Sequence, residues 1–471
     1  MNRTKSGATE HPGLLGQVKQ FLSRFAQDGT RAMSRLLAPE QLQALLLRHC
    51  PGYRERLYPP LATLSLFVQQ VLGADHGCRD AVAQGLSARL AQGLGPCSPN
   101  TGPYCKARQR LPAALLAELC ELLGQRLCRA QIDAWRWRGR EIKLIDGTTV
   151  SMPDTAANQA QYPQNGRQKS GLGFPLMRIV AVISLGCGAV LGWAQGACKG
   201  KNTGEPSLLA QLHDALAPGD VVLMDRCYAG YFTLARLQGL HVDFVSRQQA
   251  RRSTDFRRGK RLGKKDHVVH LARPRRPAEM SQTDYDALPL RIELRETRVG
   301  GWVLITSLLD AGRVSREELS RLYGLRWQVE LDLRAIKVVM QMDRLRCKSP
   351  AMVVKEVAAH LLAYNLVRSV MAQAAHGARL SPRELSFKGA LQHLRAFAPV
   401  LLGCGAHAIG QLHALLLTTI GRVLCPKRPG RVEPRAVKRR PKNMRSLTQP
   451  RALLKAQLQA SRARSMAEVC A

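Results

Sequence analysis

The sequence predicts a mixed α/β core that lies between two helical regions. Apolar residues recur at helical spacing from residue 14 to residue 130, and short apolar strands then alternate with helices from residue 141 to residue 246. Helical spacing returns after residue 316. Strands and helices that alternate in this way are typical of an α/β domain. A chain of 471 residues is long enough for roughly two to four domains.

The charge of the chain points to a polyanionic partner. Lys and Arg number 71 against 34 Asp and Glu, which gives a formal net charge of +37 at pH 7. Each phosphate that a cation neutralises releases counterions and so favours binding to DNA. A generally basic proteome would also raise the total, but it does not explain why the cations cluster in a few segments.

Cysteine and histidine spacing argues against a disulfide framework and against a zinc site. The 13 Cys are scattered without a CxxC pair, and the 12 His show no metal-binding spacing. The most apolar stretch, Leu176–Gln195, is broken at Gly186–Gly188, so it predicts two strands around a turn rather than a membrane span. Because no apolar signal segment follows the first residues, we expect a bacterial cytoplasmic protein that associates with the nucleoid when bound to DNA.

The N-terminal region, residues 1–135, is predicted to be a helical DNA-binding domain. Its apolar residues repeat at helical spacing in three segments, Leu36–Leu47, Leu61–Leu72 and Ala113–Leu127. The segment Asn100–Arg110 places three cations beside Tyr104, which favours contact with a phosphate backbone. A helical scaffold with a solvated basic face fits the same pattern, so both interpretations stand at this point.

The central region, residues 136–345, is predicted to hold the α/β core. Its expected strands are Ile142–Ile145, Leu176–Ser184, Ala189–Gln195, Val221–Met224 and His241–Ser246. Helices are expected at Ser207–Leu216 and Tyr231–Leu240. Val221–Met224 is a continuous apolar run, as expected for a strand that is buried on both faces.

Within this region, residues 247–310 are predicted to be a β-rich insertion with a strongly basic loop. Residues 247–276 carry 12 Lys or Arg and two acids, and strand-like alternation follows in Leu290–Thr297 and Trp302–Leu309. Since the excess charge is of one sign, we expect the loop to contact DNA. The alternative is a solvated run that is partly disordered.

The rest of the chain is predicted to be helical and then strongly basic. Helices are expected at Glu317–Met340, Val353–Ala375 and Gly389–Gly410. Residues 346–420 thus form a helical C-terminal region, and residues 421–471 form a basic tail that is disordered in part. Residues 422–445 hold ten Lys or Arg, one Glu and four Pro, a composition typical of a segment that tracks phosphates.

Two acids stand at equivalent places in the predicted core. Asp146 and Asp225 each follow a short apolar strand, and each begins a polar turn. The carboxyl ends of neighbouring strands open into one crevice, so we expect the two carboxylates to meet there. For either residue alone the competing interpretation is an ordinary turn or helix cap.

A polar stripe on the predicted helix Glu317–Met340 contains Tyr323, Arg326, Glu330 and Lys337. At about 100° per residue, the four side chains fall within about 60° of one another. The stripe borders the apolar face of the helix, where it can line a cleft. A surface salt bridge would explain Arg326 and Glu330 at i, i+4, but it does not explain Tyr323 on the same line.

Three carboxylates from two strands and a helix suit a site for phosphoryl transfer with two metal ions. In such a site, two divalent cations about 3.5–4 Å apart activate the attacking oxygen and stabilise the leaving oxygen. Mg²⁺ prefers oxygen ligands and is commonly held by carboxylates plus a substrate phosphate. We therefore predict that Asp146, Asp225 and Glu330 are catalytic and bind Mg²⁺, with Mn²⁺ as a substitute.

The neighbours of these acids are expected to bind the DNA or to support the fold. Arg326 and Lys337 are predicted to bind flanking phosphates, and Tyr323 to donate a hydrogen bond to one. Glu205 precedes the predicted helix Ser207–Leu216, and we interpret it as a helix cap or dipole partner rather than as a metal ligand.

These residues resemble the Y-(2)-R-(3)-E-(6)-K signature of the insertion-sequence-four family of DDE transposases. The four signature positions are Tyr323, Arg326, Glu330 and Lys337. Asp146, followed by Gly147, and Asp225, followed by Arg226, resemble the first and second acids of the family. The similarity covers roughly residues 35 to 420 and implies an RNase H-like catalytic core with a β-strand insertion before the helix that carries the Glu.

The resemblance also implies the activity and the partners. It implies metal-dependent cleavage and strand transfer at the terminal inverted repeats of an insertion sequence, by a cut-and-paste route into target DNA. It further implies a synaptic complex of two or more protomers on double-stranded DNA. The alternatives are an RNase H-like endonuclease without strand transfer and a catalytically silent DNA-binding derivative.

An aromatic residue of the insertion is a further expectation from the family. In relatives that cut through a DNA hairpin, such a residue helps to hold a flipped base. Trp302 and Phe256 are the two rivals in this chain, and the sequence does not decide between them.

Overall fold

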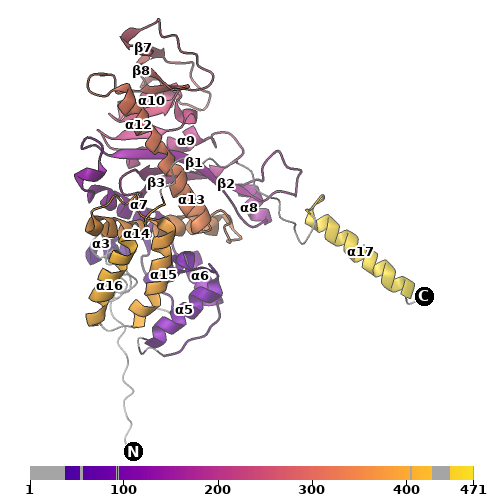
Figure 1. The fold of residues 1–471 in the computed structure, drawn as a ribbon. Helices are drawn as coiled ribbons and strands as arrows, with labels where there is room; N and C mark the ends of the chain where they lie inside the picture. The colour runs from indigo at the N-terminus through magenta and orange to yellow at the C-terminus, as the bar shows by residue number, and fades with distance from the viewer. Residues whose placement is uncertain are drawn as a thin grey trace, which may run out of the picture.

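A nine-stranded mixed sheet forms the centre of the structure, and helices cover both of its faces (Figure 1). The computed structural model describes residues 38–53, 57–91, 93, 95–403, 406–426 and 446–469. Across the sheet the strands follow the order β3-β2-β1-β4-β5-β9-β8-β7-β6. The mixed α/β class that the sequence predicts is therefore confirmed.

Five strands form the part of the sheet that carries the first two acids. They are β1 (Ile142–Ser151), β2 (Leu176–Ser184), β3 (Val190–Ala197), β4 (Val221–Met224) and β5 (Asp243–Arg247). β1, β4 and β5 run parallel, while β2 pairs antiparallel with both β1 and β3. The first strand was expected to end at Ile145, but it continues to Ser151 because β2 pairs with it along this whole length.

Four strands of the insertion extend the same sheet beyond β5. They are β6 (Lys260–Gly263), β7 (Asp266–Ala272), β8 (Arg291–Val299) and β9 (Trp302–Thr306). The stretch predicted as a basic loop thus contains the β6–β7 hairpin. A fully buried Arg295 on β8 donates hydrogen bonds of 2.9 and 2.6 Å to the carboxylate of Asp266, and this pair ties β8 to β7.

One face of the sheet packs against helices from both ends of the described chain. These helices are α3 (Pro39–His49), α4 (Pro60–Leu72), α7 (Ala113–Arg129), α14 (Pro350–Ala378), α15 (Phe387–Gly403) and α16 (Ala406–Gly421). Their apolar side chains join those of β1 and β2 in one core. The helices before and after the sheet therefore pack together on this face, around the long α14 (Figure 1).

The opposite face is covered by α9 (Glu205–Leu209) and α10 (Tyr231–Gly239), whose apolar side chains form a second core. The prediction of one helix over Ser207–Leu216 is wrong, because α9 ends at Leu209 and a separate 3-10 turn follows at His213–Ala215. At this turn the carbonyl of Ala215 accepts a hydrogen bond of 2.8 Å from the buried ammonium of Lys143.

The cations beside Tyr104 fall into two groups in the structure. Tyr104 and Arg108 are buried, and the guanidinium of Arg108 lies 4.9 Å from the centre of the Phe67 ring. Lys106 and Arg110 are exposed. Arg108 therefore serves the helical scaffold, as the alternative interpretation expects, and the two exposed cations remain available for a phosphate backbone.

Parts of both ends of the chain fall outside the described residues. Residues 1–37 and residues 427–445, the larger part of the predicted basic segment, are among them, so the predictions for these residues stay predictions. Further along, α17 (Arg451–Val469) lies apart from the sheet (Figure 1). In the ranges that are described, no helix combines the length and the apolar character that crossing a lipid bilayer requires.

A buried ion-pair network holds α13 (Gln328–Arg334) against α14 and the sheet. Asp332 is fully buried and accepts a hydrogen bond of 3.0 Å from the Tyr364 hydroxyl. Nη1 of Arg383 donates to both carboxylate oxygens of Asp332, at 2.6 and 2.8 Å, and Arg368 pairs with the same carboxylate. Because Arg383 also donates to the carbonyl of the last residue of β2, at 2.7 Å, one cluster joins helix and sheet.

Asp332→Asn is expected to lower the free energy of unfolding by about 3–5 kcal/mol, because two buried guanidinium groups lose their charged partner. Urea denaturation followed by circular dichroism measures the change. The control is Arg334→Gln, which alters an exposed side chain of the same helix and should change stability by less than about 0.5 kcal/mol. Equally small effects of the two variants would contradict the structural role of the network.

Candidate active site

The pairing of β1 with β4 brings the first two predicted acids side by side. The register of these parallel strands matches Ile145 with Met224, so the residues that follow, Asp146 and Asp225, are neighbours where β4 ends. Asp225 comes directly after a fully buried strand and before a short 3-10 turn. On β5, the hydroxyl of Ser246 donates a hydrogen bond of 3.2 Å to the backbone carbonyl of Asp225.

The third predicted acid, Glu330, lies on a helical segment that is less regular than the sequence predicts. The expected helix Glu317–Met340 is divided into α12 (Arg316–Gly324), a 3-10 turn (Leu325–Trp327), α13 and a π-helical turn (Ala335–Val339). At the π turn, the N–H of Met340 donates to the carbonyl five residues back, at 3.0 Å. Both Ile336 and Met340 are fully buried there, so core packing overrides the 3.6-residue periodicity.

Arg326 links Glu330 to Asp146 across the gap between helix and sheet. Its Nη2 donates a hydrogen bond of 2.8 Å to Oε1 of Glu330, and its Nη1 lies 3.8 Å from Oδ2 of Asp146. All three residues are half-buried. A guanidinium group that faces two carboxylates offsets part of their mutual repulsion. The structure therefore brings these three predicted site residues together.

Burial determines how tightly Asp146 holds its proton. Removal from water raises the pKa of this carboxyl to about 6, although the N–H of Gly147 and the charge of Arg326 both act to lower it. The carboxylates of Glu205 and Glu330 act in the same direction as burial. At neutral pH and without a bound cation, Asp146 therefore carries its charge at a cost to stability.

Tyr323 and Lys337 complete the predicted stripe, but their settings differ. Tyr323 is 7% exposed, and its hydroxyl has no hydrogen-bond partner of sound geometry among the described residues. Burial raises the pKa of this hydroxyl, so it remains a donor at neutral pH. Lys337 is half-buried in the π turn, so a uniform rotation of about 100° per residue does not give its direction.

The acids suit a divalent cation by their chemistry, but they do not form a closed coordination shell. Over the described ranges of the chain, no group of three or more His, Cys, Asp or Glu could hold a metal ion. Asp146, Asp225 and Glu330 supply oxygen donors, which Mg²⁺ prefers. Arg326 supplies the positive charge between two of them in this structure.

An exposed Trp with a stacked Arg lies at the start of β9. Trp302 is 53% exposed, and the guanidinium of Arg247, the last residue of β5, lies 4.3 Å from the centre of its ring. Phe256, the rival aromatic, packs instead against His267, with ring centroids 4.7 Å apart. Trp302 thus presents more ring surface for stacking. Arg247 could not be singled out from the sequence, because it is one of 12 cations within residues 247–276.

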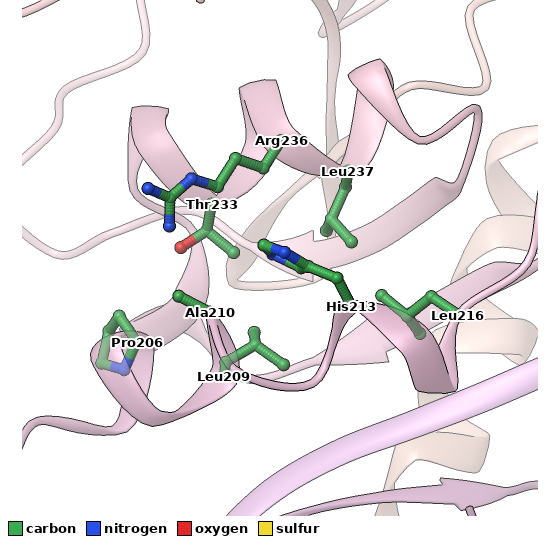
Figure 2. Close-up of a pocket in the computed structure, with 8 residues that line it drawn as sticks. All are labelled: Pro206, Leu209, Ala210, His213, Leu216, Thr233, Arg236 and Leu237. Carbon is green, nitrogen blue, oxygen red and sulfur yellow. The ribbon is translucent and has the colours of Figure 1, made fainter. Parts of the chain in front are cut away.

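A small hollow lies on the other face of the sheet, between α9 and α10 (Figure 2). Its lining comes from these two helices and the turn between them: Pro206, Leu209, Ala210, His213, Leu216, Thr233, Arg236 and Leu237. None of the predicted acids lines it. The candidate active site is therefore separate from this hollow.

Comparison with known proteins identifies the class to which this chain belongs. Residues 137–366, which contain both Asp and the Glu, match the family described as the transposase DDE domain. The chain is 31% identical over 346 residues to the transposase InsG for insertion sequence element IS4 of Escherichia coli (strain K12). This similarity covers 71% of this chain and 76% of that protein.

Two further similarities are shorter or more distant. The chain is 30% identical over 80 residues to the transposase for insertion sequence element IS421 of Escherichia coli, which is 17% of this chain and 22% of that protein. It is also similar to a chain of a solved structure, the cryo-EM structure of the piggyBac transposase synaptic complex with hairpin DNA. That similarity covers 88% of this chain and 87% of the other, at 10% identity and a TM-score of 0.43.

The match of residues 137–366 to the DDE domain, together with the similarity to the IS4 transposase, places the protein among the DDE transposases, enzymes that cleave and transfer DNA strands. Within that class, the similarity to the IS4 transposase extends over most of both chains. The chain belongs to the insertion-sequence-four family, and it is a DNA transposase.

Asp146→Asn is expected to stabilise the protein by about 1–3 kcal/mol at pH 7.5 in EDTA, because one pKa unit corresponds to about 1.4 kcal/mol. The folded-state pKa of about 6 lies above the ordinary value of 3.8, so ionised Asp146 lowers stability above pH 6. The gain should vanish below about pH 4, where folded and unfolded states both hold the proton.

Urea denaturation at several pH values measures this difference. Asp154→Asn is the control, since it removes the same charge from an exposed residue near the end of β1. A gain for Asp146→Asn that stays constant from pH 7.5 to pH 4 would contradict burial of the charge as its cause.

Proposed function

We propose that Asp146, Asp225 and Glu330 are the catalytic acids of this transposase. The observation that carries the proposal is the register of β1 and β4, which makes Asp146 and Asp225 neighbours, together with Arg326, which spans from Asp146 to Glu330. In-line displacement at phosphorus needs groups on both the attacking and the leaving side. Acids on two separate elements, a sheet and a helix, can act on those two sides.

The same three acids are proposed to hold Mg²⁺, with Mn²⁺ as a substitute. DDE transposases generally use divalent metal ions. When two such ions are bound, they activate the attacking oxygen and stabilise the leaving oxygen. The contribution of the chain is to supply carboxylate oxygens from β1, from the end of β4 and from α13. Arg326 supports this role, because it offsets the repulsion between Asp146 and Glu330.

The proposed substrates are the inverted-repeat ends of an insertion sequence and a target DNA, joined by a cut-and-paste route. Tyr323, Arg326 and Lys337 are proposed to contact phosphates beside the scissile bond. The unpartnered hydroxyl of Tyr323 supports this, since a buried donor without an acceptor is costly unless the substrate supplies one. Arg326 supports it as well, because guanidinium groups bind phosphates with two parallel hydrogen bonds.

The proposed core is RNase H-like and lies in residues 136–345, with residues 247–310 as an insertion before the helix that carries Glu330. The extension of the sheet from β5 into β9, followed by α12, supports this division. Residues 1–135 are proposed to bind DNA, residues 346–420 to support the core and residues 421–471 to form a basic tail. Self-association in a synaptic complex is proposed because two ends of one element have to be held together.

Asp146→Asn, Asp225→Asn and Glu330→Gln are each expected to lower cleavage at least about 100-fold while DNA binding survives, because each removes one charged ligand of the reacting centre. Cleavage of a labelled end substrate in Mg²⁺ and a gel-shift assay measure the two properties. Glu317→Gln, an exposed acid of α12, is the control and should keep full activity. Near wild-type cleavage by any of the three variants would remove that residue from the site.

Truncation after Pro426 is expected to weaken DNA binding and to flatten its salt dependence. Residues 427–445 hold nine Lys or Arg, and each one that contacts a phosphate contributes about 0.9 to the slope of log K against log salt. This end point is chosen because Leu424 still pairs with Leu385 in the folded part. DNA-binding titrations from 50 to 200 mM salt, at constant pH, measure the salt slope of the full-length and the truncated protein. Equal slopes for the two proteins would exclude the tail from the DNA interface.

A further inference from the structure

One stretch of the α/β core contains cations but no acids. Residues 155–204 hold five Lys or Arg and no Asp or Glu. Of the acids that border the stretch, Asp154 accepts a hydrogen bond of 2.8 Å from Gln159, and Glu205 accepts one of 3.5 Å from the thiol of Cys227. Since Glu205 makes no capping bond in α9, the helix cap expected from the sequence is wrong. The stretch as a whole therefore carries charge of one sign.

Two loops at one end of the sheet carry four of these five cations. We call them the basic loops: residues 162–175, between α8 (Ala156–Gln161) and β2, and residues 198–204, between β3 and α9. The four cations are Arg167, Lys169, Lys199 and Lys201. All four side chains are exposed, and no carboxylate in the described part of the chain forms an ion pair with any of them. The loops therefore present free positive charge to a partner.

The two basic loops lie against each other. The ammonium nitrogen of Lys199 would be 4.0 Å from a Cβ placed at Gly166. The register of β2 and β3, which matches Met177 with Ala197, also brings both loops to the same end of the sheet. Their cations thus form one surface.

The first basic loop is held in one shape by the side chain of Gln164. Its amide oxygen accepts hydrogen bonds of 3.0 and 3.1 Å from the N–H groups of Gly171 and Gly173. Its amide nitrogen donates to the carbonyls of Gln168 and Lys169, at 3.1 and 2.9 Å. Because four bonds from one side chain fix the loop, its exposed side chains lose little freedom when a partner binds.

An exposed aromatic ring stands on the same fixed loop. Phe174 is 62% exposed and lies two residues before the start of β2. DNA-binding proteins use apolar side chains such as Phe to enter between base steps, while nearby cations contact the phosphates. An exposed ring beside unpaired cations therefore suits duplex DNA better than it suits a protein or a membrane surface.

The strand register relates the basic loops to the proposed catalytic acids. Asp146 pairs with Ala181 of β2, and five residues later Ser151 pairs with Leu176, where the first basic loop joins β2. At about 3.4 Å per residue, five residues of a strand span about 17 Å. The same length of duplex DNA contains about five base pairs. A duplex with its reacting phosphate at Asp146 can therefore reach the loops.

The far end of the basic tail meets the first basic loop. Pro450, directly before α17, lies so close to Gly171 that a Cβ there would be 3.0 Å from its Cγ. α17 leaves the molecule on the side where α8 lies (Figure 1). In the sequence, Pro450 follows residues 427–445, which hold nine Lys or Arg. Two cation-rich segments that are distant in the chain are thus joined at these loops.

We propose that the basic loops bind the phosphate backbone of the DNA end about five base pairs from the bond that is cut, and that Phe174 packs against a base step there. This inference rests on the proposed function, because it takes Asp146 as the marker of the cut bond. The four cations supply an attraction that salt weakens. The ring supplies a contact that does not depend on charge.

DNA binding by the full-length protein at several salt concentrations tests the role of the cations. The probe is a labelled duplex that carries one end of the element, and EDTA is present so that no cleavage occurs. The double variant Arg167→Gln, Lys169→Gln is expected to lower the slope of log K against log salt by about 1.8, which is about 0.9 for each lost phosphate contact. The matched control is Lys388→Gln, an exposed cation of α15, which should leave the slope unchanged.

The same titrations test the role of the ring. Phe174→Ala is expected to weaken binding about tenfold at every salt concentration without a change in slope, because it removes stacking but no charge. Phe174→Tyr keeps a ring and should keep the affinity. The matched control is Leu415→Ala on α16, which is 54% exposed and should bind DNA as the wild type does. All the replaced side chains are exposed, so each variant should also melt at the temperature of the wild type.

The outcomes separate this inference from the proposed function. A lower slope in the charge variant, together with a loss of affinity at constant slope in Phe174→Ala, supports the inference. A wild-type slope in the charge variant, or wild-type affinity in Phe174→Ala, overturns it. Effects confined to a duplex of unrelated sequence also overturn it, because they would place the loops on target DNA. None of these results touches the proposed function, which stands or falls with cleavage by the acid variants in Mg²⁺.

Discussion

The placement of α13, the helix that carries Glu330, depends on one buried carboxylate, that of Asp332. Asp332 lies two residues beyond Glu330. It forms ion pairs with Arg368 of α14 and with Arg383 of the segment after α14. Arg383 uses its remaining donors on the carbonyls of Ser184 and Leu185 at the end of β2. A buried ion pair contributes little net stability compared with apolar packing, but it permits only one arrangement of its partners. The distance between helix and sheet is therefore set by charge geometry.

The proposed site differs from the rest of the chain in its balance of acidic and basic residues. Cations exceed acids by 37 over the whole sequence, yet in the part of the chain that the structure describes, Asp146 and Glu330 share one paired cation, Arg326. This contrast suits an enzyme of DNA, since cations spread over the surface attract phosphates. The acids of the proposed site, in turn, would attract the divalent cation that a phosphate also binds. Arg326 belongs to both sets, because a guanidinium can pair with a carboxylate or with a phosphate.

Local patterns predicted most of the strands and the contact between Arg326 and Glu330, because both reflect periodicity along the chain. The continuous apolar run Val221–Met224 predicted both ends of β4 correctly. The i, i+4 spacing of Arg326 and Glu330 predicted the contact between them. The π turn after α13 and the early end of α9 could not be predicted from the sequence, because each depends on packing against segments that are distant in the chain. Arg108 shows the same limit: its sequence context suggests a DNA contact, while its burial against Phe67 depends on another helix.

The positions of the proposed catalytic acids depend on how the sheet packs against the helices on its two faces. The helix that carries Glu330 packs in the core shared with the N-terminal and C-terminal helices, whereas α9, which begins with Glu205, packs in the core on the opposite face. Asp146 and Asp225 lie between the two, fixed by the pairing of β1 with β4. A loosening of the core that contains α13 would therefore move Glu330 relative to this pair. Since effective catalysis tolerates errors of only about 1 Å, the helical regions support the proposed site by holding α13, and with it Glu330, in place.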